Sequence, residues 1–195
     1  MPHPERTLGN EADDLFKSMR NYIESDDPFS FKSLNFSSKK INIKKFKKPA
    51  KQNEVLVSTI IADNEAASVE KCINSLGVKA KVKKYLHFEI DATDRLDINT
   101  IISTDVLFNP SKEYIANIKE ESDIYRFLVR SKDDIVGQSL AQTLQDRFNL
   151  SGLKSIKKGV VWEVKINSSR AKKDVDIILN SHIFSNPISQ ECHEY

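Results

Sequence analysis

Two glutamates have the clearest potential for chemistry in this sequence. Glu89 and Glu163 each have a large hydrophobic residue on both sides, in segments where apolar and polar residues alternate. A pair of carboxylates could act as a general acid and a general base. Such alternation is more typical of a half-buried strand whose polar side faces solvent. We therefore interpret both glutamates as solvent-facing and keep acid–base work as the alternative.

The C-terminal tail contains residue types that bind metals, in the run Glu191-Cys192-His193-Glu194. Adjacent side chains of an extended chain point to opposite faces, so four neighbours rarely converge on one ion. We expect an exposed C-terminus here and no metal site. Sequence patterns for nucleotide phosphates, dinucleotides and catalytic zinc are also missing, and the chain has only five glycines. We therefore expect no cofactor.

Composition limits the class of protein. The chain has 195 residues, of which 39% are hydrophobic, and a formal net charge of +2. No segment approaches the run of about 20 apolar residues that a membrane helix needs. Two cysteines suit a reducing compartment, and the first 25 residues lack the apolar core of a secretory signal. We expect a soluble, cytoplasmic protein.

A block of lysines without acids occupies residues 39–51. Its members are Lys39, Lys40, Lys44, Lys45, Lys47, Lys48 and Lys51. Such a block can attract nucleic acid or anionic lipid. No aromatic platform or arginine accompanies it, so we favour a solvated linker. We assign residues 1–52 to an N-terminal arm with one short helix at about 11–23.

The rest of the chain repeats one order of elements. Its first half predicts a strand, a helix, a strand and a helix, at 54–61, 64–75, 82–90 and 96–107. The second half predicts the same order, at 124–130, 135–149, 153–166 and 174–184. The two final helices end at Asn109-Pro110 and Asn186-Pro187, because proline cannot continue a helix. A sharp turn at each Asn-Pro suits a following strand that leaves its own unit and pairs elsewhere.

Three landmarks recur at nearly constant distance along the chain. Leu56 and Leu128 are 72 residues apart, Glu89 and Glu163 are 74 apart, and the two Asn-Pro asparagines are 77 apart. Units this small are marginal alone, so two copies should share a core. We predict an α+β pseudo-dimer of repeats at 53–121 and 122–195, with an antiparallel sheet and helices on one face.

Trp162 occupies the position in the second repeat that Phe88 occupies in the first. A large aromatic residue in a strand is typical of a core or of a partner interface, and we favour these roles for Trp162. Stacking on a ligand is the alternative.

Short motifs in the two repeats connect them to a known family. The second repeat has Asp134-Ile135-Val136-Gly137, then Lys158-Gly159 with Glu163, then Asn186-Pro187 before Glu194-Tyr195. The first has Asp63-Asn64-Glu65-Ala66, then Lys84-Tyr85 with Glu89, then Asn109-Pro110 before Glu113-Tyr114. This order resembles PurS, the small subunit of phosphoribosylformylglycinamidine synthase in purine biosynthesis. Departures include Ile135 and Asn64 for the family's proline, and Val160 where the family often has a lysine.

The resemblance implies a tandem pair of ferredoxin-like units and a non-catalytic role. PurS-like proteins bridge the ATP-dependent synthetase subunit and the glutaminase subunit of their complex, and they pair as dimers. It also implies candidates for partner contact or loop positions: Asp134, Gly137, Lys158, Gly159, Trp162, Phe184, Asn186, Pro187, Asn109 and Pro110.

Two other classes of function are kept open. An ACT-like, small-molecule-sensing protein would share the order of elements, and Gly137 would lie in its ligand turn. Nucleic-acid binding through the lysines of the arm is the other alternative, although no strand carries the stacking aromatics of an RNA-recognition domain. Homo-oligomerisation is compatible with each class.

Overall fold

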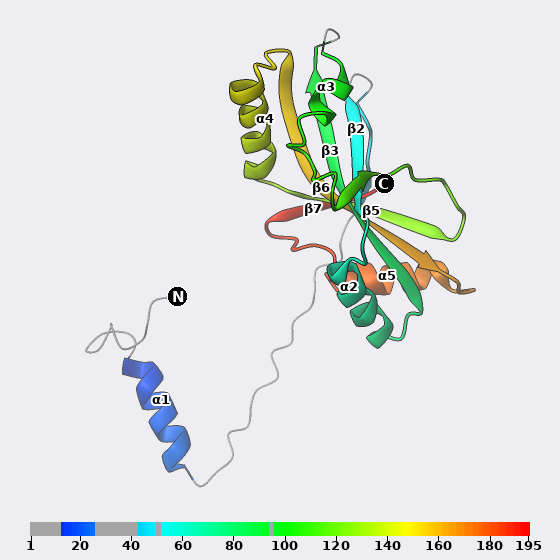
Figure 1. Cartoon of the computed structure of the whole chain (residues 1–195). Helices are drawn as coiled ribbons and strands as arrows, with labels where there is room; N and C mark the ends of the chain where they lie inside the picture. Colours follow the sequence, from blue (N-terminus) through cyan, green and yellow to red (C-terminus); the bar gives the residue numbers. More distant parts are fainter. Residues whose placement is uncertain (1–12, 26–42, 50–51, 94–95) are drawn as a thin grey trace. The chain divides into compact units, whose positions relative to one another are not determined.

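A computed structural model describes residues 13–25, 43–49, 52–93 and 96–195. The chain divides into two compact units, Met1–Ser38 and Lys39–Tyr195. Helix α1 (Asp13–Glu24) belongs to the first unit, and all other described elements belong to the second (Figure 1). Among the described residues, no helix combines the length and the apolar character needed to cross a membrane.

One mixed sheet organises the second unit. Within the described residues it has seven strands: β1 (Lys44–Lys45), β2 (Asn53–Thr59), β3 (Ala80–Ala92), β4 (Glu113–Ile115), β5 (Ile124–Ser131), β6 (Leu153–Ile166) and β7 (Gln190–Glu194). Its helices are α2 (Asn64–Ser75), α3 (Ile98–Ile102), α4 (Ile135–Phe148) and α5 (Ala171–Asn180). The order across the sheet is β1-β7-β5-β6-β3-β2-β4. Only β1 and β7 run parallel in this part of the chain, and the prediction of an α+β fold is confirmed.

The two halves of the repeat place equivalent strands in the same order, counted outward from the central pair β3 and β6. Strands β3 and β6 pair antiparallel from Ala80↔Ile166 to Ala92↔Leu153. On one side follow β2 and β4, and on the other side follow β5 and β7, each in the chain order of its own half. Strand β1 adds to the β7 edge and has no counterpart beside β4 within the described residues.

The strands after the two Asn-Pro turns do not pair as expected. Strand β4 pairs with β2, and β7 pairs with β5, so each returns to the first strand of its own half. The turns explain this, because Glu113 and Gln190 donate backbone hydrogen bonds to the carbonyls of Asn109 and Asn186. The long β3·β6 ladder joins the halves instead.

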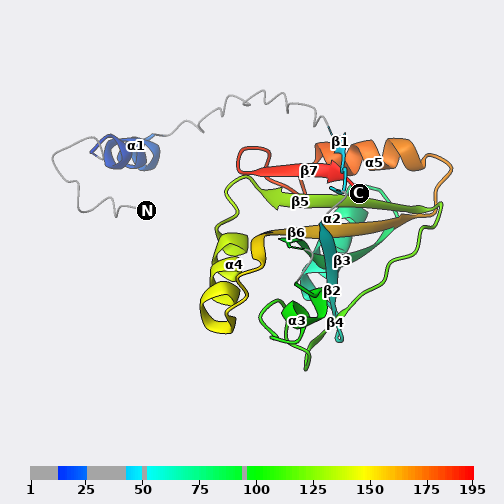
Figure 2. The ribbon, with the colours of Figure 1, turned by 90° about the horizontal axis from the view of Figure 1, so that it is seen from above.

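All four helices of this unit cover one face of the sheet, in two clusters that each mix the halves. One cluster contains Ile73 of α2 and Ile178 of α5, over Val82 and Trp162. Figures 1 and 2 show α2 and α5 near each other. The other cluster joins Ile101 of α3 to α4 residues, over the far ends of β3 and β6. Because full burial of an isoleucine stabilises by about 1.5–3 kcal/mol, both clusters bind the halves together.

Helix α3 is shorter than the predicted helix at 96–107. It begins at the cap Asp97, whose carboxylate accepts a hydrogen bond from the Asn99 amide. The hydroxyls of Ser103 and Thr104 then bond to carbonyls of the preceding turn, and Asp105 has a left-handed φ of 55°. The apolar spacing beyond residue 102 reflects packing of loop residues against the same cluster, not helix.

The opposite face of the sheet is covered by chain segments instead of helices. Its small apolar cluster includes Leu56, Leu128 and Val161, against which Phe46 and Tyr195 pack. Residues 43–49, which the sequence analysis assigns to the arm, therefore lie along this sheet, with β1 inside them. Of the block of lysines, Lys39, Lys40 and Lys51 lie outside the described residues.

Candidate functional site: an enclosed ionic face and a basic pocket

The two candidate carboxylates are buried, which corrects the solvent-facing interpretation. Glu89 and Glu163 expose only 2% and 5% of their surface. They do lie on the side of the strands away from the helices, as alternation predicts. Residues 43–49 and Tyr195 enclose that side of the sheet, which we call the enclosed face. Local alternation cannot reveal this arrangement.

Each of these two buried glutamates forms an ion pair with an arginine. Arg130 Nη2 donates to Glu89 Oε2 at 2.9 Å, and Arg126 Nε donates to Glu163 Oε2 at 2.8 Å. Since Glu163 lies opposite Lys83, six residues before Glu89 on β3, the carboxylates are about 20 Å apart at the usual strand rise. That distance excludes joint acid–base work on one bond. Burial and the charge of Glu163 raise the pKa of neighbouring Tyr85 to about 12.

A fully buried histidine lies beside the first of these ion pairs. His87 Nε2 is 2.8 Å from Glu54 Oε1, and its Nδ1 is 3.3 Å from Arg130 Nη2. The ring meets Tyr195 edge-on, with centroids 5.6 Å apart. Burial would raise the pKa of Glu54, but hydrogen bonds and charge from His87 and Lys48 outweigh it and lower that pKa. Burial and Glu54 raise the pKa of Tyr195 to about 12.

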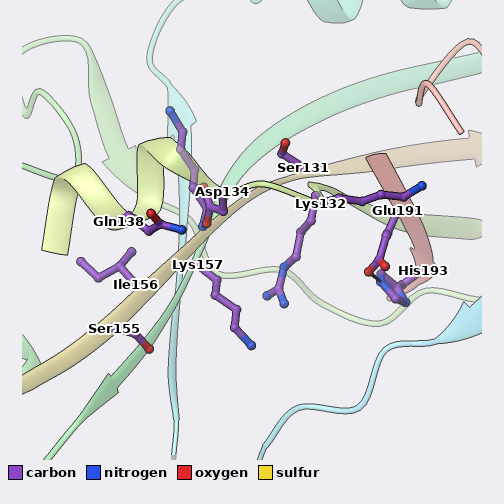
Figure 3. Close-up of a pocket in the computed structure, with 11 residues that line it drawn as sticks. Ser131, Lys132, Asp134, Gln138, Ser155, Ile156, Lys157, Glu191 and His193 are labelled. Carbon is purple, nitrogen blue, oxygen red and sulfur yellow. Dashed lines mark hydrogen bonds and ion pairs between the residues drawn. The ribbon is translucent and has the colours of Figure 1, made fainter. Parts of the chain in front are cut away.

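A basic pocket opens at the end of the sheet where α4 begins. It has a volume of about 420 Å³ and is lined by Arg130, Ser131, Lys132, Asp134, Gln138, Ser155, Ile156, Lys157, Lys158, Glu191 and His193. Figure 3 shows side chains from the start of α4, from β6 and from β7 arranged around it. Four cations and two acids thus line this cavity, which we call the basic pocket.

Asp134 builds the wall of the basic pocket. It caps α4, and its Oδ1 accepts the Gly137 amide at 2.8 Å. Its Oδ2 accepts the Lys158 amide at 2.6 Å, so one carboxylate joins the helix start to β6. A Cβ at Gly137 would collide with that carboxylate and with the carbonyl of Ile156. The structure therefore brings three predicted site residues together, Asp134, Gly137 and Lys158.

Neither motif glycine lies in a loop, which corrects that part of the expectation. Gly137 is in the first turn of α4, and Gly159 is inside β6. A Cβ at Gly159 would lie 2.8 Å from Leu128 Cδ1 and 3.0 Å from Arg130 Cγ. Both glycines are needed for close packing, not for an unusual backbone.

Trp162 and Phe184 belong to the core. Their rings stack with centroids 5.5 Å apart, and both side chains are buried. Neither is therefore placed to contact a partner or a ligand in this structure. Asn186-Pro187 and Asn109-Pro110 form exposed turns, and the Pro187 carbonyl accepts a hydrogen bond from Lys132 beside the basic pocket.

Sequence reasoning missed several residues of the basic pocket, including Arg130, Lys132 and Lys157. The sequence does contain a pattern that points to the pocket: Arg130 and Lys132 lie at the end of one predicted strand, and Lys157 and Lys158 lie inside the next. The pairing of β5 with β6, which brings them together, is a long-range contact that spacing alone does not give.

The tail residues do not gather around an ion. Among the described residues, no group of three or more histidine, cysteine, aspartate or glutamate side chains is placed to hold a metal. The tail forms strand β7, in which Glu191 and His193 face the basic pocket. Cys192 packs instead against the core on the other side, where burial raises the pKa of its thiol to about 11.

No protein-family model matches this chain, and no curated protein has a significantly similar sequence.

Proposed function

We propose that this chain is a PurS-like, non-catalytic subunit of phosphoribosylformylglycinamidine synthase, with two ferredoxin-like units fused as a pseudo-dimer. In this role it bridges the synthetase and glutaminase subunits. The observation that carries the proposal is the strand order, in which both halves contribute equivalent strands on either side of β3 and β6. On this view β1 is an addition from the segment before the first unit, which accounts for the seventh strand.

The two Asn-Pro turns support duplication independently of the strand order. Asn109 donates its amide to Glu113 Oε2 at 2.8 Å and accepts the Ser111 amide at 3.0 Å. Asn186 does the same with Gln190 Oε1 at 2.7 Å and with the Ile188 amide at 2.9 Å. The two turns thus share both contacts, as a duplication predicts.

The helix starts support duplication as well. Asp63 and Asp134 cap α2 and α4, and each accepts the amide three residues later, from Ala66 and Gly137. These are the positions at which the sequence resembles the PurS helix start. The matched caps therefore support the proposal that both units carry the same helix-start motif.

Exposed apolar residues beside the motifs suit contact with a partner. Ile188 and Ile135 expose 83% and 72% of their surface, directly after Pro187 and Asp134. Anchors of this kind supply most of the energy of a protein interface. The ionisable groups of the enclosed face, in contrast, bind one another, which suits a structural subunit.

The proposal is tested by reconstitution with the synthetase and glutaminase subunits of the same organism. We expect the full chain to form a ternary complex with them in the presence of glutamine and nucleotide, measured by light scattering after gel filtration. Ile188→Asp should weaken the complex at least tenfold, whereas Ile61→Asp, at a comparably exposed site, should leave it unchanged. If no complex forms under any of these conditions, the subunit role is wrong.

The ACT-like alternative differs from the subunit role in what stabilises the chain. A sensor gains stability from its effector in the absence of partners, because ligand bound to the native state shifts unfolding. A thermal-shift screen with amino acids and purine nucleotides therefore separates the two functions. Nucleic-acid binding would show as a salt-dependent affinity that is lost when residues 1–52 are deleted.

A further inference from the structure

We propose that the basic pocket binds a small molecule carrying a phosphate monoester. This inference does not depend on the proposed subunit role. Its volume of about 420 Å³ lies within the range of small-molecule sites. Ten of its eleven lining residues have polar or charged side chains, and Ile156 is the one aliphatic residue among them. A pocket of this size and polarity suits a hydrophilic ligand.

Positive charge enters the basic pocket from three places in the fold. Arg130 comes from β5, Lys132 from the connection to α4, and Lys157 with Lys158 from β6. A phosphate monoester carries nearly two negative charges and three acceptor oxygens, so it can satisfy several separate donors at once.

One of these cations has unused bonding capacity. The ammonium of Lys158 makes no ion pair or hydrogen bond with any described residue, because Asp134 is engaged by backbone amides. Arg130 contributes charge only, because its Nη2 binds Glu89 and its Nε is buried away from the basic pocket. Glu89 offsets part of the charge of Arg130 and Lys157, but it lies behind the wall of the basic pocket.

The first half contains an equivalent pocket in which the charge is cancelled. This pocket, of about 370 Å³, is lined by Asp63, Lys83 and Lys84, at the positions of Asp134, Lys157 and Lys158. There Lys84 Nζ is 3.2 Å from Asp63 Oδ2 and 2.5 Å from Glu65 Oε2.

Other positions of the equivalent pocket also lack positive charge. Ser58 stands where the basic pocket has Arg130, and Glu70 adds a further acid. The pocket of the first half is therefore an internal control: it has the same framework, but its own carboxylates neutralise its lysines.

The test uses glycerol 3-phosphate as the probe and glycerol as its uncharged match, at constant ionic strength. Amide signals of the ¹⁵N-labelled full chain report on binding, above all those of Gly137 and Lys158. We expect saturable shifts with glycerol 3-phosphate and none with glycerol. Inorganic sulfate at the same ionic strength should shift these signals more weakly.

Matched variants decide whether the site is the basic pocket. Lys157→Gln and Lys83→Gln each remove a lysine near a buried glutamate, at 3.4 Å and 3.8 Å, so their effects on the fold should be similar. We expect Lys157→Gln and Lys158→Gln to weaken binding about tenfold each, and Lys83→Gln to leave it unchanged. Equal weakening by Lys83→Gln, equal shifts with glycerol, or the absence of saturable shifts would each overturn the proposal.

Discussion

Arg130 belongs to both features of the candidate site. One side of its guanidinium binds the buried Glu89, and the Phe46 ring lies 5.0 Å from its central carbon. Its Nη2 also approaches His87, and its side chain reaches the basic pocket. Arg130 therefore connects the enclosed face to the basic pocket. We expect its replacement to lower the stability of the fold as well as any affinity of the pocket for a ligand.

Replacement of Arg130 should destabilise the protein through the carboxylate that it leaves behind. Removing one member of a buried ion pair costs about 3–5 kcal/mol, whereas apolar replacement of both members is often close to neutral. We expect Arg130→Met to lower the free energy of urea unfolding by several kcal/mol, and Arg130→Met with Glu89→Met to recover most of it.

An exposed ion pair provides the control for this experiment. Lys154 lies 3.5 Å from Asp91 and is half-exposed, and such pairs contribute at most about 1 kcal/mol. If Arg130→Met costs no more than Lys154→Met, the buried pair does not stabilise the enclosed face.

The elements that the sequence predicted well are determined by residues that are close together in the chain. Helix α2 spans Asn64–Ser75 as predicted, because the cap Asp63 and the spacing of Val69 and Ile73 are adjacent in the chain. Strand β1 could not be predicted, since its partner is far away in the chain: Lys44 pairs with His193 of β7. Asp134 and Lys158 could be named from short local motifs. The enclosure of Glu89 could not be predicted, because it depends on residues 43–49 and Tyr195, which are far away in the sequence.

Helix α4 gives a prediction that opposes helix propensity. Alanine normally stabilises a helix interior by up to about 1 kcal/mol relative to glycine. At position 137 the added methyl group collides with Asp134 and with the Ile156 carbonyl. We therefore expect Gly137→Ala to lower stability by about 1–3 kcal/mol in thermal or urea unfolding.

The equivalent position in α2 is the natural comparison. Ala66 is buried there without such a conflict, so Ala66→Gly should cost about 1 kcal/mol, as propensity predicts. Stabilisation by Gly137→Ala would show that the contact between Asp134 and β6 tolerates displacement.

At the scale of the whole molecule, the two halves are arranged so that neither has a complete core. The cluster that includes Trp162 needs Ile73 from the first half, and the cluster around Phe88 needs Leu144 from the second. The β3·β6 ladder, the longest in the described sheet, also takes one strand from each half. Each half that the sequence repeat outlines therefore lacks a complete core of its own.

Separate expression of the halves tests this directly. Without residues 53–121, the fragment 122–195 loses strand β3, which pairs with β6, and the α2 residues Ala66 and Ile73 of the cluster that contains Trp162. A unit of this size with an open core face is below the threshold of stability. We expect the fragment to be unfolded as a monomer, or to associate through β6, and the mixed fragments to regain native circular dichroism. A monomeric fragment that unfolds cooperatively by itself would contradict the shared core, because each half would then hold enough apolar contacts of its own.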